Sequence, residues 1–155
     1  MKRYTITKYH EYPAVQLYTV EFEGLESNET DLFISRFSSL EEHSFDFNAI
    51  ISWINRIGEY GALERYFRPE KRACAIPISS GHNLRLYCFR VTDEILILGN
   101  GGVKSSQKVK NSPDCFPHFE IMNQVATKVY WALKNEKLKI AGRELIGKLN
   151  FKTQS

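Results

Sequence analysis

The first part of the chain alternates between apolar and polar positions in a way that predicts strands. Successive side chains of a strand point to opposite faces of a sheet, so a period of two marks one. This pattern predicts strands around residues 3–9 and 15–23, with Pro13 between them. Gly24 and a polar stretch then end the second strand, and Asn28 is placed to cap a short helix. The apolar face of that helix would consist of Leu32, Phe33 and Phe37.

The clearest periodicity is helical and begins near residue 46. Apolar residues recur there at spacings of three and four, which places them on one face of a helix. Asp46 is the predicted N-cap, and the apolar positions end before Gly58 and Gly61, which separate this helix from a shorter one over residues 62–67. The face consists of Phe47, Ile50, Ile51, Ile54 and Ile57.

A block rich in strand patterns follows. Residues 73–78 form a short apolar run, residues 84–91 alternate, and residues 95–98 are apolar throughout. Turn-forming residues lie between these runs, so the simplest arrangement is three antiparallel strands joined by short turns. The glycine-rich residues 99–102 are interpreted as a tight turn that ends the block, because they lack the spacing of a phosphate-binding loop.

The remaining residues predict a basic loop, a helix and a small C-terminal element. Residues 103–110 are basic and polar. Residues 119–135 carry a second helical pattern, and residues 138–151 fit either a small hairpin or a short helix. The buried face of the second long helix would consist of Phe119, Met122, Val125, Ala126, Val129 and Leu133.

Composition and charge narrow the classes of protein. The 155 residues suit one domain, with 43% hydrophobic and 25% charged residues. Residues 1–50 hold 4 Lys or Arg against 9 Asp or Glu, whereas residues 51–155 hold 17 against 9. The net charge therefore runs from −5 to +8, which fits a nucleic-acid surface in the later part or an uneven solvated surface.

Cysteine and histidine usage points to no cofactor or metal. The three cysteines, Cys74, Cys88 and Cys115, are odd in number and none are spaced two apart, so a reducing compartment is expected. Cys74 and Cys88 lie in apolar runs and are expected in the core. The four histidines have no zinc-ligand spacing. The opening residues lack the apolar core of a signal peptide, and no run suits a transmembrane helix, so the prediction is a cytoplasmic protein without membrane contact.

Three stretches in the middle of the chain carry a family resemblance. IGEYGAL at residues 57–63 runs on to RPEK at 68–71, LRLYCFR occupies residues 84–90, and ILILG at 95–99 leads into GVKSSQK at 102–108. Their order resembles the RelE/ParE-type toxin superfamily, and most of all its HigB-like branch. The resemblance covers about residues 16–110 of the single domain 1–155 and leaves residues 111–155 as a C-terminal extension.

The resemblance implies a fold, an activity and partners. The fold would be α+β: a small antiparallel curved sheet with helices packed on one side, plus a C-terminal helix and possible hairpin. The activity would be that of a toxin of a toxin–antitoxin module, an mRNA interferase. This ribosome-dependent endoribonuclease cleaves RNA by 2′-OH attack without a metal or cofactor. Its partners would be a cognate antitoxin, the ribosome and mRNA. The oligomeric state stays open.

The residues expected to carry that chemistry lie in the basic part of the chain. Arg85 suits phosphate binding because a guanidinium binds phosphate oxygens in pairs, and a meander would bring it near Lys104. His118 is the nearest residue to the family's C-terminal catalytic position. The expected catalytic group is Arg85, Lys104 and His118. The expected RNA-binding group is Arg65, Arg68, Lys71, Arg72, Tyr87, Arg90 and Lys108.

Each of these residues also has a structural interpretation. Arg85 could be a solvent-facing strand arginine, and Tyr87 a half-buried core aromatic. The cations between residues 65 and 72 could instead interact favourably with the negative end of a helix dipole at a helix C-terminus. At the level of function, the alternative is a non-catalytic RelE-like protein-interaction or regulatory module. Poisoning of DNA gyrase, as in the ParE branch, fits less well because the ending Lys104-Ser-Ser-Gln-Lys108 resembles the HigB-like pattern.

Overall fold

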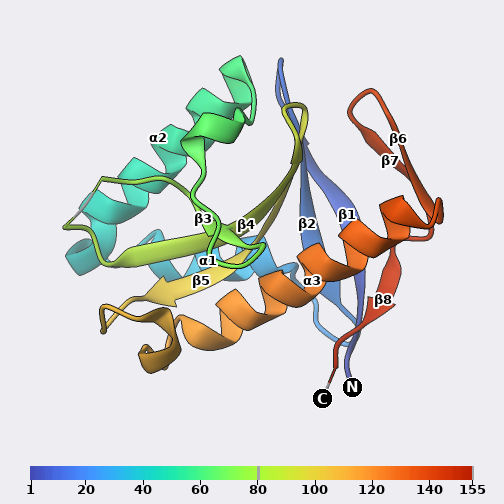
Figure 1. Ribbon diagram of the computed structural model, residues 1–155. Helices are drawn as coiled ribbons and strands as arrows, with labels where there is room; N and C mark the ends of the chain where they lie inside the picture. The colour runs from blue at the N-terminus through green and yellow to red at the C-terminus, as the bar shows by residue number, and fades with distance from the viewer. Residues whose placement is uncertain (80, 155) are drawn as a thin grey trace.

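The computed structural model describes residues 1–79 and 81–154 and has an α+β architecture (Figure 1). Within these residues there are three α-helices, a six-stranded sheet and a two-stranded sheet. The helices are α1 (Glu29–Phe37), α2 (Ser44–Tyr60) and α3 (Phe116–Lys134), with 3₁₀ turns η1 (Glu41–His43), η2 (Glu64–Tyr66) and η3 (Val109–Asn111). The strands are β1 (Arg3–Glu11), β2 (Gln16–Phe22), β3 (Cys74–Ala75), β4 (Leu84–Thr92), β5 (Ile95–Val103), β6 (Leu138–Ala141), β7 (Glu144–Gly147) and β8 (Asn150–Lys152).

The large sheet is mixed, which corrects the expectation of an antiparallel one. Its order is β3-β4-β5-β2-β1-β8, and β2 pairs parallel to β5 while the other neighbours are antiparallel. The parallel ladder is short, joining Gln16–Tyr18 with 95–97, and beyond it β2 and β5 diverge (Figure 1). The parallel pairing is possible because α1 and α2 supply the long crossover that parallel strands require.

The first turn of α1 lies against the middle of both diverging strands. The Thr30 hydroxyl is 2.7 Å from the Thr19 hydroxyl of β2 and donates to the Gly99 carbonyl of β5 at 3.1 Å. Asn28 caps the helix as expected, accepting a hydrogen bond from the Asp31 amide at 2.8 Å. Leu32 is 37% exposed, so the expected apolar face is wrong at that position.

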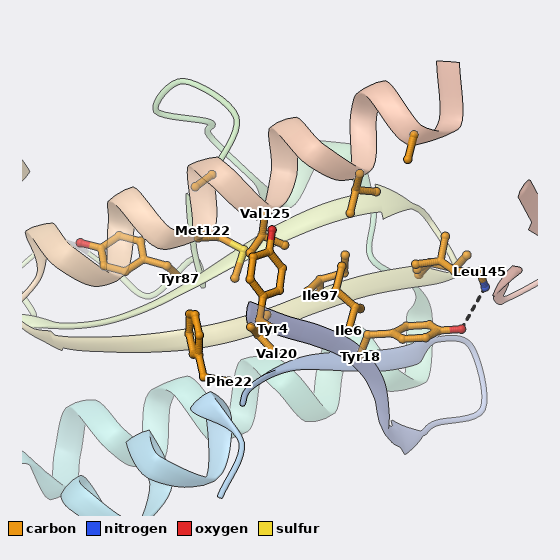
Figure 2. Packing of buried hydrophobic residues seen from close by; sticks show 14 of the residues in the cluster. Tyr4, Ile6, Tyr18, Val20, Phe22, Tyr87, Ile97, Met122, Val125 and Leu145 are labelled. Atoms are coloured by element: carbon orange, nitrogen blue, oxygen red, sulfur yellow. Dashed lines mark hydrogen bonds between the residues drawn. The ribbon is translucent and has the colours of Figure 1, made fainter. Parts of the chain in front are cut away.

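Helices cover both faces of the sheet: α1 and α2 share one face, and the C-terminal helix α3, for which the sequence predicted no side, covers the other. The apolar stripe of α2 packs with Leu17, Leu86 and Leu98 on one face. On the other face α3 packs with Tyr18, Tyr87 and other residues of the sheet (Figure 2). The α3 side of this second core is formed by Phe119, Met122, Val125 and Val129, as the sequence pattern predicted.

The C-terminal segment forms a hairpin, one of the two expected alternatives. Strands β6 and β7 pair from Leu138 with Gly147 to Ala141 with Glu144. The Tyr18 hydroxyl accepts a hydrogen bond from the Leu145 amide at 2.9 Å, which ties the hairpin to β2 (Figure 2). None of the three described α-helices has the length and apolar character needed to cross a membrane.

Four local expectations are wrong. Residues 99–102 lie inside β5 and not in a turn. Glycine is needed there for close packing, since a Cβ at Gly101 would come within 1.7 Å of the Arg85 carbonyl oxygen on β4. The expected helix over residues 62–67 is reduced to η2, and the strand at 73–78 to the two residues of β3. Asp46 lies within α2, whose N-cap is His43.

Candidate functional site

The structure brings Arg85 and Lys104 to the same end of the β4–β5 ladder. Arg85 is paired with Gly102 in the register of the two strands. Just past the last pair, the Lys104 amide donates to the Asn83 carbonyl at 2.7 Å. We call this region, comprising His82, Asn83, Arg85, Lys104 and Asp46, the β4-start site.

Arg85 is a cation fixed in place without a carboxylate partner in the described residues. Its Nη1 donates to the main-chain carbonyls of His82 at 2.7 Å and of Leu84 at 3.0 Å. The side chain is partly buried, and its other guanidinium nitrogens make no hydrogen bond within residues 1–79 and 81–154. A guanidinium held in this way keeps its positive charge available for an anion.

A histidine–aspartate pair joins the segment just before β4 to α2. His82 Nδ1 is 2.5 Å from Asp46 Oδ1, and the two side chains are only 14% and 18% exposed. Asp46 Oδ2 also accepts hydrogen bonds from the amides of Asn83 at 2.9 Å and Leu84 at 3.1 Å. The first turn of α2 therefore fixes the loop that leads into β4.

The electrostatics of the pair set the role of each histidine nitrogen. Burial favours a higher pKa for Asp46, but hydrogen bonds from His82, Leu84 and Asn83 outweigh it and hold the pKa below its ordinary value. Since an ionised carboxylate can only accept, the proton of neutral His82 lies on Nδ1. Nε2 then carries a lone pair, which is the arrangement of a histidine general base oriented by an aspartate.

An exposed aromatic ring completes the site. Phe45 is 76% exposed, and its ring stacks on the His82 ring at 5.2 Å with an interplanar angle of 9°. It lies off the buried stripe of α2, so packing does not explain it. Such a ring can stack a nucleobase.

His118 lies on α3, which covers the opposite face of the sheet from α2. Within the described part of the chain, its side chain makes no hydrogen bond to Arg85 or Lys104. Burial and the Arg36 guanidinium lower the pKa of His118, while Asp114 acts in the opposite direction. Asp114 itself binds Arg36 through two hydrogen bonds of 2.9 Å. The structure thus associates His118 with that ion pair, and Asp114 in turn accepts a hydrogen bond from the amide of Val103, the residue before Lys104, at 2.7 Å.

Three of the expected RNA-binding residues gather elsewhere, at the other end of β4. A groove of about 610 Å³ lies between η2, β3 and β4, and we call it the β4-end groove. Arg90 in this groove donates from Nε to the Ala62 carbonyl at 2.6 Å and also pairs with Asp93. Its basic lining residues are Arg65, Arg72 and Arg90.

The other two arginines of this groove stack on aromatic rings. The Arg72 guanidinium lies 3.9 Å from the centroid of the Tyr130 ring of α3, and that of Arg65 lies 5.4 Å from the Tyr66 ring. The Arg72 amide also donates to the Asn123 side chain at 3.1 Å. Arg72 thereby connects the β3 edge to α3.

The remaining expected RNA-binding residues are dispersed or buried. Lys71 lies 3.9 Å from Glu120, and Arg68 and Lys108 are exposed. Tyr87 is 4% exposed and its ring packs edge-on against Phe119 beneath α3 (Figure 2). The ring therefore has no open face for a base, which corrects the stacking role expected for Tyr87.

The three cysteines lie in the cores, as expected for Cys74 and Cys88. Each is a free thiol whose pKa is raised by burial. Within residues 1–79 and 81–154, no three His, Cys, Asp or Glu side chains gather so as to hold a metal ion.

Sequence reasoning missed His82, Asp46 and Phe45. His82 lies in a segment interpreted as a turn, and Asp46 was interpreted as a helix cap. The signals available were a histidine just before a strand arginine and a phenylalanine off the helix stripe. Comparisons with family models, curated proteins and solved structures found no match for this chain.

Proposed function

We propose that this protein is an endoribonuclease that cleaves mRNA on the ribosome, the toxin of a toxin–antitoxin module. The observation that carries the proposal is the grouping at the β4-start site. There a histidine oriented by a carboxylate precedes β4, its main-chain carbonyl accepts a hydrogen bond from a guanidinium without a carboxylate partner, and the chain at Lys104 lies across the ladder. A base and positive charges are what RNA cleavage by the 2′-OH requires.

The chemistry assigns one role to each side chain. His82 Nε2 takes the proton of the ribose 2′-OH as the 2′-oxygen attacks the adjacent phosphorus. Arg85 stabilises the charge on the phosphorane oxygens. The bond from phosphorus to O5′ breaks, and the leaving oxygen takes a proton from the Lys104 ammonium. The products are a 2′,3′-cyclic phosphate and a 5′-hydroxyl, so no external reactant is consumed. Asp46 is a positioning residue that holds the histidine tautomer.

The need for a 2′-OH restricts the substrate to RNA. Phe45 would stack a base next to the scissile phosphate, and the antitoxin would cover the same surface. These partner assignments rest on the family resemblance together with the site.

A second function is favoured by a different observation. Large apolar side chains are exposed near the C-terminal end of α3 and on the hairpin, with Trp131 at 54% and Ile146 at 52%. Such residues suit a protein-interaction surface. In this alternative the chain is a non-catalytic regulatory module, and Arg85 and His82 only stabilise the start of β4.

Cell-free bacterial translation of a reporter, with primer extension of its mRNA, separates the two functions. The endoribonuclease produces new mRNA ends that require active ribosomes and disappear with Arg85→Ala. Intact mRNA with normal protein yield contradicts the proposal and leaves the regulatory module. Intact mRNA with stalled synthesis also contradicts cleavage, although it retains the ribosome as the target.

A further inference from the structure

A third basic region lies where β1 begins and β2 and β8 end. It is a cleft of about 750 Å³, separate in its lining from the β4-start site. Its cations come from β1, α3, the segment before β8, and β8 itself. They are Arg3, Lys128, Lys148 and Lys152.

The charge of this cleft selects for anions. Four cationic side chains line it against the two carboxylates Glu21 and Glu23. Within residues 1–79 and 81–154, none of the four cations forms an ion pair. By contrast, Lys8 of β1 pairs with Glu144. Unpaired cations that converge on one cleft raise the local concentration of anionic ligands.

The floor of the cleft is aromatic. The Tyr4 ring lies 5.6 Å from that of Phe22 and 5.8 Å from that of Phe151, measured between centroids. All three rings line the cleft, and Phe151 is only partly buried. An aromatic surface flanked by cations suits a planar group that carries a phosphate.

The Tyr4 hydroxyl lies between the sheet and α3. Tyr4 is 2% exposed, and its oxygen has no hydrogen-bond partner in the described part of the chain. Figure 2 shows the ring reaching from β1 toward Val125 of α3. Because this oxygen is shielded from solvent, it does not contact a ligand in the cleft, and Tyr4 contributes to the floor through its ring.

We propose that this cleft binds a nucleotide, with its phosphate among the lysines and its base against Phe151. The same chemistry is presented by a free nucleotide and by a nucleotide within an RNA strand. The inference does not depend on cleavage at the β4-start site, because no residue is shared between the two.

Titration calorimetry with adenosine 5′-monophosphate tests the proposal. We expect it to bind roughly tenfold more tightly than either inorganic phosphate or adenosine, since it makes both sets of contacts. Lys128→Gln should weaken binding about tenfold, whereas Lys137→Gln, which removes the same charge from an exposed position outside the cleft, should not. Tyr4→Phe, which keeps the ring and removes the buried hydroxyl, should leave binding of the nucleotide unchanged. Melting curves of each variant verify folding.

Three results would contradict nucleotide binding in this cleft. Binding of inorganic phosphate as tight as the nucleotide, equal losses in Lys128→Gln and Lys137→Gln, or no binding at about 1 mM nucleotide overturns the proposal. An adenosine hexanucleotide that binds more tightly than the mononucleotide, and loses affinity with Lys128→Gln, supports an RNA strand as the source. Equal affinity of the two supports a free nucleotide.

Discussion

The two ends of strand β4 carry arginines in opposite circumstances. At its start, Arg85 is held by two main-chain carbonyls and has no carboxylate partner in the described residues. At its end, Arg90 is bound to the Ala62 carbonyl and paired with Asp93. The first side chain keeps its charge available to a ligand, while the second uses its charge to hold η2 against the sheet.

Under the proposed function, the density of basic residues is a poor guide to the position of the catalytic site. The β4-end groove holds more arginines than the β4-start site, yet Arg72 stacks on Tyr130 and Arg90 is neutralised by Asp93. The β4-start site has fewer cations, but it also holds an oriented histidine. A cation near an oriented histidine can take part in acid–base chemistry, whereas a cation that is already paired or stacked stabilises the fold.

The largest effect is expected at the dyad. His82→Ala should lower the rate of mRNA cleavage about 10²- to 10⁴-fold, because the general base is lost. Primer extension on translated reporter mRNA measures the rate. His10→Ala, which removes an exposed histidine outside the site, is the matched control and should cleave normally. Normal cleavage by His82→Ala would remove the histidine from the mechanism.

At the other end of β4, the effect should be on stability. Arg90→Ala leaves the Ala62 carbonyl without its partner and should lower the free energy of unfolding by about 1–3 kcal/mol. Urea unfolding measures this, with Arg68→Ala at an exposed position as the control. A stability loss no larger than that of the control would show that the bonds of Arg90 do not hold η2.

Acid titration can sharpen the comparison further. The pKa of Asp46 is lowered in the folded protein, so this carboxylate stabilises the fold above the unfolded pKa of about 3.9. That stability is lost as the pH falls through the lower folded pKa. Asp46→Asn should therefore show a shallower loss of stability below pH 4 than the wild type, although Asp114 still titrates in both proteins. Identical acid profiles would contradict the role of the Asp46 bonds.

The smallest effect concerns bonded and unbonded hydroxyls in the core. Tyr4→Phe removes a hydroxyl without a partner, so the free energy of unfolding should stay constant or rise by up to about 1 kcal/mol. Tyr18→Phe leaves the Leu145 amide unpaired and should destabilise the protein in the same urea series. If both variants lose the same stability, the Tyr4 hydroxyl has a partner in solution.

Some features followed from the sequence because local spacing determines them. The stripe of α2 and that of α3 were predicted since helical periodicity reports burial directly. The proximity of Arg85 and Lys104 was predicted because a β-meander brings the start of one strand to the end of the next.

Other features depend on tertiary packing that no local pattern encodes. Asp46 and His82 are 36 residues apart and meet only because α2 packs against the start of β4. The parallel pairing of β2 with β5 requires the crossover through two helices. The glycines of β5 suggested a turn, whereas they are needed for close approach to β4 and to Asp114.

The most direct test of the account compares two arginines of one strand in one assay. Arg85→Ala and Arg90→Ala remove the same side chain from positions five residues apart on β4. Primer extension of ribosome-bound mRNA, at a temperature where both variants are folded, should show cuts with Arg90→Ala at the wild-type sites and none with Arg85→Ala. Cuts that persist with Arg85→Ala and disappear with Arg90→Ala would place the chemistry at the other end of the strand and contradict the account.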